Sequence, residues 1–282
     1  RRQRQMCIRD SYDFLHPDLK RALTEYYRVD SLEDYDQVLR AVGYFTGRYG
    51  KIDWLESNNE YWLELDARLR TDFHITTGPR AHEIEKYKSK LAMKEYYKKA
   101  GIPCARCAPV TDLDAGLAFV REAGYPVVVK PDNGVGAVAT WKLENEEDLR
   151  RFFQAPPEAP YLMEEYVSGS VTTYDGICNS KGEVLFAASH VTRNSIMDMV
   201  NKHVPTYYYV DKEVPPDVEA AGKAALKAFG ASSRFFHLEF FRLTEAKEGL
   251  GSVGDIVALE VNMRPCGGFS PDMMNYANST NV

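Results

Sequence analysis

The chain has 282 residues, of which 44% are hydrophobic, so it is long enough for one large core or for two to three small ones. Lysine and arginine number 35 against 41 acidic residues, and the resulting charge of −6 argues against a nucleic-acid partner held by charge. No apolar run approaches the roughly 18 residues of a membrane span, so we expect no membrane contact. Five scattered cysteines and no evident signal peptide lead us to expect a cytoplasmic protein.

The first eleven residues are expected to lie outside the fold. Arg1 to Ser11 resemble a translated transposase adapter from sequencing-library preparation, and Met6 to Ser11 are the telling part. We therefore exclude residues 1–11 from the predicted fold as an artefact. On this hypothesis residue 12 is not a natural start, whereas a genuine basic tail is the alternative.

Residues 12–80 are predicted to form a partial, Rossmann-like parallel α/β domain. Ser31 is a suitable cap for its first helix. The predicted elements are a helix over residues 31–50, a strand over 52–55, a helix over 58–68 and a strand over 74–77. Helices and strands that alternate at these lengths favour a parallel sheet, and the missing opening strand agrees with a truncated start.

The remaining residues, 81–282, are predicted to mix helices and strands, which makes the chain an α/β (α+β) protein. Gly78 and Pro79 mark the boundary before this part. The predicted helices cover residues 81–100, 112–123, 145–153 and 215–229, and the predicted strands cover 127–129, 161–163, 174–178, 183–189, 235–242 and 255–264.

One buried strand leads into a glycine loop that suits phosphate binding. The β-branched run Val127 to Val129 delivers Lys130 to a loop that contains Gly134 and Gly136. A cation beside exposed backbone N–H groups is the minimum needed to hold a polyphosphate. The loop lacks the G-K-[ST] ending of the common phosphate loop, so that motif is excluded, and a simple hairpin is the alternative.

A second pair of strands offers oxygen ligands for a divalent metal. Strand periodicity puts Glu260, Asn262 and Arg264 on one face of their strand, opposite three apolar residues. On the partner strand, His237 and Glu239 share a face. Mg²⁺ prefers oxygen ligands, so two carboxylates and an amide oxygen suit one or two such ions, with Arg264 left to hold an anion. A solvated edge with a Glu–Arg pair is the alternative.

Four motifs in this order resemble the ATP-grasp enzymes, in the branch of biotin carboxylase, the carbamoyl-phosphate synthase large chain and many carboxylate–amine ligases. The motifs are the helix Lys90 to Pro103, Val-Val-Val-Lys130-Pro with its glycine loop, Met163 to Val167, and the strands His-Leu-Glu239 and Leu-Glu260-Val-Asn262-Met-Arg264-Pro. The resemblance implies an ATP-grasp domain over residues 81–282, with a mobile lid subdomain at about 125–165. Residues 12–80 resemble, by layout, the domain that precedes ATP-grasp in these enzymes.

The resemblance also implies roles for the matching residues. The residues expected to bind ATP are Lys90, Lys130, Gly134, Gly136, Glu164, Glu165, Tyr166 and Val167. The Glu165 carbonyl and the Val167 amide are the expected partners of adenine. Glu239, Glu260 and Asn262 would bind Mg²⁺, or Mn²⁺ in its place.

The implied activity is that of an Mg-ATP-dependent, ADP-forming ligase. A substrate carboxylate would attack the γ-phosphate, and an amine or other nucleophile would then displace the acyl phosphate. Arg264 and Arg193, and with them His203, would face the transferred phosphate, although a surface role for Arg193 and His203 is an equal alternative. Bicarbonate as the acceptor, or a catalytically silent ATP-binding regulatory module, are the alternative functions.

Two features depart from the family pattern. Ser170 and Val171 stand where relatives place a carboxylate for the ribose, and Asp175 is a candidate substitute. Family members usually continue well beyond Cys266, so we expect a domain that is truncated at its C-terminus. The expected partners are small-molecule carboxylate and amine substrates, without nucleic acid or membrane, and a homodimer is an option because it is common in the family.

Overall fold

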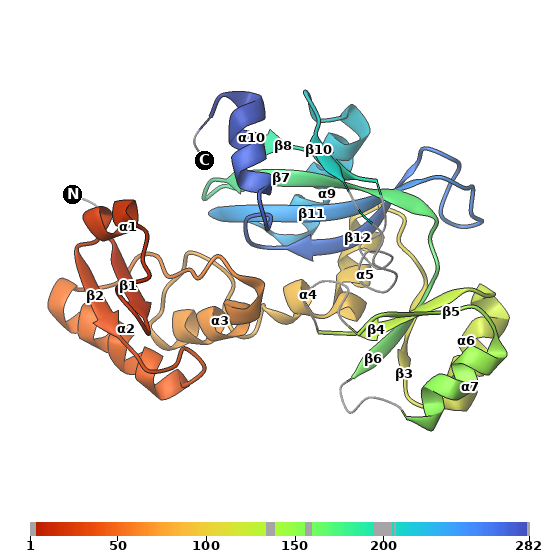
Figure 1. Cartoon of the computed structure of the whole chain (residues 1–282), viewed down its shortest axis with the longest axis horizontal. Helices are drawn as coiled ribbons and strands as arrows, with labels where there is room; N and C mark the ends of the chain where they lie inside the picture. Colours follow the sequence, from red (N-terminus) through yellow and green to blue (C-terminus); the bar gives the residue numbers. More distant parts are fainter. Residues whose placement is uncertain (1–3, 134–138, 156–159, 194–204, 206, 281–282) are drawn as a thin grey trace. The chain divides into compact units, whose positions relative to one another are not determined.

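The computed structural model describes residues 4–133, 139–155, 160–193, 205 and 207–280 (Figure 1). Its contacts divide the chain into two units, residues 1–57 with 64–81 and residues 58–63 with 82–282. Among the described residues, no helix is both long enough and apolar enough to cross a membrane.

The first unit contains a parallel pair of strands packed against helices. Its elements are β1 (Met6–Arg9), α1 (Pro17–Ala22), β2 (Glu25–Arg28), α2 (Tyr35–Tyr49) and α3 (Leu63–Asp72). β1 and β2 pair in parallel. Val38 and Val42 of α2 are buried with Leu69 of α3, which gives the unit its own small core. α2 begins after Asp34 rather than Ser31, because the Asp34 carboxylate accepts the backbone N–H of Gln37.

Two expectations for this unit are wrong. Met6–Arg9 form β1, so the exclusion of residues 1–11 from the fold does not hold for these four, while their adapter origin stays a prediction. Residues 52–55 and 74–77 are not strands. The Leu55 carbonyl accepts from Nε and Nη2 of Arg70 at 3.0 and 2.8 Å, and Ile75 N–H donates to the Arg70 carbonyl at 2.9 Å. These backbone groups are thus satisfied by Arg70 instead of a neighbouring strand.

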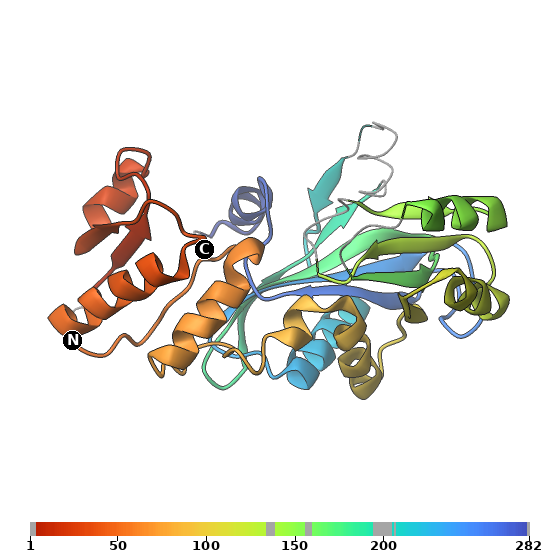
Figure 2. The ribbon, with the colours of Figure 1, turned by 90° about the horizontal axis from the view of Figure 1, so that it is seen from below.

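The second unit is built on a six-stranded sheet with helices on both sides (Figure 2). The strands are β7 (Gly169–Cys178), β8 (Val184–Ala188), β9 (His190–Thr192), β10 (Tyr208–Val210), β11 (Arg234–Leu243) and β12 (Ile256–Asn262). They run in the order β10-β9-β7-β11-β12, with β8 also paired to β7. The helices are α4 (Glu85–Lys88), α5 (Lys90–Ala100), α9 (Pro216–Phe229) and α10 (Ser270–Asn278). Tyr97 of α5 and Phe229 of α9 pack with Leu238 and Val261 of the sheet.

A smaller four-stranded sheet forms the rest of this unit. Its elements are β3 (Cys107–Val110), α6 (Leu113–Ala123), β4 (Val127–Pro131), β5 (Trp141–Leu143), α7 (Glu146–Gln154) and β6 (Tyr161–Glu165), in strand order β3-β6-β4-β5. Figure 1 shows α6 and α7 together on one face of it. The predicted lid boundary at residue 125 is too late, because β3 pairs with β6 and α6 packs on the same core.

Several helix limits are set by the residues that the sequence indicated. Asp112 and Asn145 cap α6 and α7 through their side chains, and α9 runs from Pro216 to Phe229 before Gly230 adopts a left-handed conformation. The single helix predicted over residues 81–100 is instead two, α4 and α5. Ser89 is extended between them, and its hydroxyl accepts the N–H of Ala92 at 3.0 Å, which starts a new helix.

Candidate active site

Two antiparallel strands bring two carboxylates opposite each other. In the register of β11 and β12, Glu239 pairs with Glu260, and His237 pairs with Asn262. Directly opposed residues of an antiparallel pair project from the same face, so these four side chains share one face of the sheet. The register skips Leu259 next to Glu260. Such bulges occur often beside functional sites because they re-aim a side chain.

The opposite face of the same strands is core. Leu238, Val261 and Met263 are at most 1% exposed and belong to the core beneath the six-stranded sheet. The side chains of Glu239 and Glu260 are each 17% exposed. The predicted separation of polar and apolar faces therefore holds for Val261 and Met263, whereas Leu259 lies in the bulge and is only partly buried. Apolar burial fixes the strands that carry the carboxylates.

The two carboxylates have different partners. Lys90 Nζ lies 3.3 Å from Glu260 Oε1, and His237 Nε2 lies 2.9 Å from Glu239 Oε1. Burial raises the pKa of Glu260. Burial acts in the same direction on Glu239, but the hydrogen bond and charge of His237, together with the charges of Arg264 and His190, outweigh it and lower the pKa of Glu239.

The donor set at this face suits a hard cation. Among the described residues, no group of three or more His, Cys, Asp or Glu side chains is arranged to hold a metal. The third oxygen donor on this face is instead the amide oxygen of Asn262. Asn262 is only 4% exposed, and its Oδ1 lies 3.4 Å from Arg264 Nη2. Mg²⁺ takes oxygen ligands, needs few from the protein and keeps waters as the remainder. Glu239, Glu260 and Asn262 offer the oxygen donors that Mg²⁺ takes, and their role as its ligands stays a prediction.

A chain of buried polar side chains lies behind Glu239. His237 Nδ1 contacts the carboxylate of Asp175, and Asp175 Oδ2 is 3.0 Å from His190 Nδ1. Burial disfavours the charged form of His237, but the Asp175 carboxylate outweighs it and raises the pKa of His237 to about 10. Burial likewise opposes ionisation of Asp175, yet the charges and hydrogen bonds of His237 and His190 together hold the pKa of Asp175 far below its ordinary value.

The suggestion that Asp175 binds a ribose is wrong for this structure. The residue is 2% exposed, and its two carboxylate oxygens contact His237 and His190. Asp175 therefore lies buried behind Glu239 and is not exposed at the surface of the site.

Strand β6 carries a carboxylate held between two lysines. Glu164 forms ion pairs with Lys94 of α5 and Lys130 of β4. Burial would raise the pKa of Glu164, but the two cations outweigh it and lower the pKa to about 2. Glu164, predicted as an ATP contact, is thus the counter-ion that fixes Lys130, the predicted phosphate contact.

The next residue, Glu165, is held by cations of its own. Its carboxylate accepts from Arg106 Nη2 at 2.8 Å and lies 3.5 Å from Lys247 Nζ. Lys247 also donates to the carbonyl oxygen of Tyr166 at 2.5 Å. The Val167 amide has no acceptor among the described residues, as expected of a group that would bind adenine. A pocket of about 350 Å³ beside Tyr166 is lined by Pro126, Lys142, Glu144, Tyr166, Ser168, Glu245, Ala246 and Lys247.

Arg264 is held in place by a residue that the sequence assigned to the first domain. Its Nε donates to Glu60 Oε2 at 3.2 Å, and Lys88 Nζ donates to Glu60 Oε1 at 3.1 Å. Glu60 lies in a short 3₁₀ helix, Glu60–Trp62, which Asn59 caps. The continuous helix predicted over residues 58–68 is therefore replaced by this turn and α3, and the turn belongs to the second unit.

The remaining predicted site residues have separate places. Arg193 is exposed, and its Nη2 donates to the hydroxyl of Tyr209 at 3.2 Å, a contact that does not connect it with Arg264. Gly134, Gly136 and His203 lie outside the described residues. Their predicted roles stay predictions.

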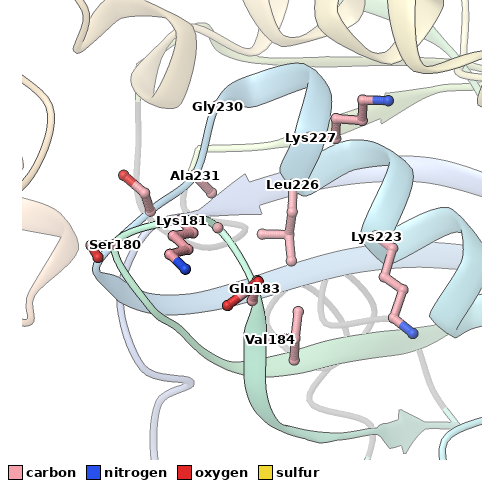
Figure 3. A pocket seen from close by; sticks show the side chains of 11 residues that line it. Ser180, Lys181, Glu183, Val184, Lys223, Leu226, Lys227, Gly230 and Ala231 are labelled. Carbon is pink, nitrogen blue, oxygen red and sulfur yellow. The ribbon is translucent and has the colours of Figure 1, made fainter.

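A larger pocket lies apart from these groups, at the C-terminal end of α9 (Figure 3). Its volume is about 520 Å³, and it is lined by Ser180, Lys181, Gly182, Glu183, Val184, Lys223, Leu226, Lys227, Gly230, Ala231 and Ser232. None of the carboxylates of β11 and β12 contributes to it. We therefore do not assign it to the same chemistry.

Sequence reasoning missed several residues that hold this site. Lys94 could have been found, because it lies one helical turn after Lys90 and hence on the same side of α5. His190 and Glu60 carried no comparable signal, since their partners are distant in sequence. Only the folded chain brings His190 to Asp175 and Glu60 to Arg264.

Solved structures with this arrangement of elements are ligases and a carboxylase. An L-amino acid ligase from Bacillus licheniformis matches with a TM-score of 0.71 at 15% identity, over 98% of this chain and 71% of that one. The biotin carboxylase domain of 2-oxoglutarate carboxylase from Hydrogenobacter thermophilus, solved with MgADP and bicarbonate, matches with a TM-score of 0.66 at 19% identity, over 99% and 65%. At these identities the likeness shows the fold, which is the ATP-grasp fold.

Sequence comparison adds similarities that cover part of the chain. Residues 85–167 match the carbamoyl-phosphate synthase L chain, ATP binding domain. A phosphoribosylamine–glycine ligase from Xanthomonas axonopodis pv. citri is 32% identical over 120 residues, which are 40% of this chain and 28% of that protein. Residues 85–167 are thus similar to the ATP-binding domain of the carbamoyl-phosphate synthase L chain, in agreement with the resemblance that the motifs predicted. It spans less than a third of the length of the curated relatives it matches.

Proposed function

We propose that the chain is an Mg-ATP-dependent, ADP-forming ligase that activates a carboxylate as an acyl phosphate for attack by an amine. The observation that carries this proposal is the shared polar face of Glu239, Glu260 and Asn262, with Lys90 against it at 3.3 Å from Glu260. The family match adds support, because it covers the segment that contains Lys90 and Lys130.

The proposed roles follow from charge and position. Lys90 and Lys130 would neutralise the α- and β-phosphates, and the Val167 amide would receive adenine beside the pocket at Tyr166. Glu239, Glu260 and Asn262 would hold Mg²⁺, which when bound neutralises phosphate charge. Arg264 would face the γ-phosphate, with its guanidinium oriented by Glu60.

The proposed reaction has two steps. A carboxylate oxygen attacks the γ-phosphorus, the bond to the β-phosphate oxygen breaks, and ADP leaves. The amine nitrogen then attacks the acyl carbon, inorganic phosphate leaves with the electron pair of the broken C–O bond, and the nitrogen loses a proton. Positioning and charge neutralisation supply the catalysis of such phosphoryl transfers.

Nucleotide binding is the first test. A thermal shift with Mg-ATP should be positive for the wild type, equivalent to about 2.7 kcal/mol at a hundredfold excess over Kd. The shift should disappear in Lys130→Ala and persist in Lys98→Ala, because Lys98 is an exposed lysine of α5 that pairs with Glu95. A wild type that melts cooperatively without any shift would overturn the proposal.

The acceptor is tested by ADP release. Carboxylate- and amine-dependent ADP release, lost in Glu260→Ala, is the expected result. Release stimulated by bicarbonate alone would instead identify the carboxyphosphate-forming alternative. Tight ATP binding with no ADP release under any acceptor would favour the regulatory module.

A further inference from the structure

The polar chain behind Glu239 is not explained by phosphate or adenine binding. It consists of His190 on β9, Asp175 on β7, and His237 and Glu239 on β11. His237 bridges the two carboxylates, with Nδ1 against Asp175 Oδ1 and Nε2 at 2.9 Å from Glu239 Oε1. Asp175 and His237 are 2% and 6% exposed, so bulk water does not substitute for these contacts.

Hydrogen-bond chemistry decides what His237 does in this position. An ionised carboxylate only accepts, and a neutral imidazole donates from only one of its two nitrogens. Contacts from both nitrogens to carboxylates therefore require N–H at both, which makes His237 a fixed cation between two anions. A fixed donor at Nε2 engages Glu239 Oε1 and leaves Oε2 for another partner.

Asp175 is itself anchored. It lies directly opposite His237 in the register of β7 and β11. Its other oxygen is 3.0 Å from His190 Nδ1, and the Thr173 hydroxyl donates to the same carboxylate. The rings of His190 and His237 are stacked, with centroids 5.8 Å apart and planes 10° apart. Three neighbouring strands thus restrict the rotamer of His237, and through it that of Glu239.

We propose that Asp175, acting through His237, is a positioning residue that orients the Glu239 carboxylate for the divalent cation. This inference rests on the proposed function of Glu239 as a metal ligand. Partners behind a ligand typically change metal affinity by about 10- to 100-fold when they are removed.

The test compares metal-dependent with metal-independent nucleotide binding. Mn²⁺ serves as the probe, because free Mn²⁺ is counted directly by electron paramagnetic resonance in the presence of saturating ADP. In Asp175→Asn one carboxylate oxygen is replaced by an amide NH₂ group, which donates, so the side chain no longer accepts from both His237 Nδ1 and His190 Nδ1 and holds the His237 ring less firmly. We expect the Kd of Mn²⁺ to rise by about 10-fold or more, while the Kd of ADP without metal is unchanged.

A control on the same strand separates positioning from general damage to the sheet. Thr172 is buried on β7, and its hydroxyl lies 3.5 Å from that of Ser189, away from the chain of His237. Thr172→Val should leave the Kd of Mn²⁺ unchanged. An equal loss of Mn²⁺ affinity in Thr172→Val would overturn the assignment of a specific role to Asp175.

The two proposals fail in different ways. Wild-type Mn²⁺ affinity in Asp175→Asn would overturn the positioning role and leave the proposed function intact. A wild type whose ADP binding ignores Mn²⁺ would overturn the metal site, and this inference with it. If Asp175→Asn does not fold, His237→Gln decides, because it removes the bridging cation directly. The same loss of Mn²⁺ affinity supports the role, and an unchanged affinity overturns it.

Discussion

Glu60 and Arg264 are 204 residues apart in sequence and form an ion pair of 3.2 Å. Glu60 also binds Lys88, so one buried carboxylate neutralises two cations. Glu60→Gln should leave both cations without a charged acceptor and lower the free energy of unfolding by about 1.5–3 kcal/mol. Urea unfolding monitored by circular dichroism measures the change. Glu64→Gln, on the exposed side of α3, is the control and should be nearly neutral. Equal stability of Glu60→Gln and wild type would show that the pair does not order Arg264.

The buried carboxylate of Glu164 predicts a pH dependence of stability. Its pKa is about 2 in the folded chain against an ordinary 4.5, so its contribution is fully present above about pH 4.5 and is lost as the pH falls toward 2. The contribution is on the order of 3 kcal/mol. In Glu164→Gln this part of the acid slope should disappear, so the difference in unfolding free energy from wild type should shrink as the pH is lowered.

A surface carboxylate provides the comparison for Glu164. Glu146 pairs with Arg150 on α7 with both side chains more than half exposed. Glu146→Gln should keep the acid slope of the wild type, because exposed pairs contribute at most about 1 kcal/mol. An unchanged slope in Glu164→Gln would show that the two lysines do not depress the pKa of Glu164.

Close packing of α9 on the six-stranded sheet predicts a severe effect of one methyl group. A Cβ at Gly222 would lie 2.1 Å from Cδ1 of Tyr174, whose side chain is fully buried. Gly222→Ala should lower the melting temperature through overpacking of about 1–3 kcal/mol or more. Gly47→Ala is the matched helical control, with no atom within 4 Å of the new methyl group. It should stabilise slightly. Calorimetry that finds both variants equal to wild type would contradict this packing.

The thiol of Cys107 should be unreactive. Burial raises its pKa to about 11, and burial also raises the pKa of Cys104. Because the thiolate is the reactive form, roughly one Cys107 in a thousand is reactive at about pH 8. Iodoacetamide followed by peptide mass spectrometry should label Cys107 slowly in the native chain and rapidly in urea. Fast native labelling would contradict the burial of Cys107.

The parts of this protein that follow local rules were predictable from its sequence. Asp112 and Asn145 cap helices through their own side chains, and the alternation around Glu260 separates core from site. The predictions that are wrong concern residues whose partners are distant in sequence. Residues 52–55 are not a strand because Arg70 donates to the Leu55 carbonyl. The turn that contains Glu60 belongs to the second unit, because Lys88 and Arg264 form ion pairs with Glu60. The bulge beside Glu260 depends on the pairing of β11 with β12, which a single strand does not encode.

The adjacent carboxylates Glu164 and Glu165 affect the register of β6 in its sheet. All five residues of β6 are buried, so hydrophobicity alone would tolerate a shift by one residue. Such a shift would turn Glu164 away from Lys94 and Lys130, and Glu165 away from Arg106, because neighbouring side chains project to opposite faces. Three ion pairs would be broken, and the two that Glu164 makes join buried side chains. The ion pairs therefore favour one register of β6 in its sheet and destabilise the registers that are shifted by one residue.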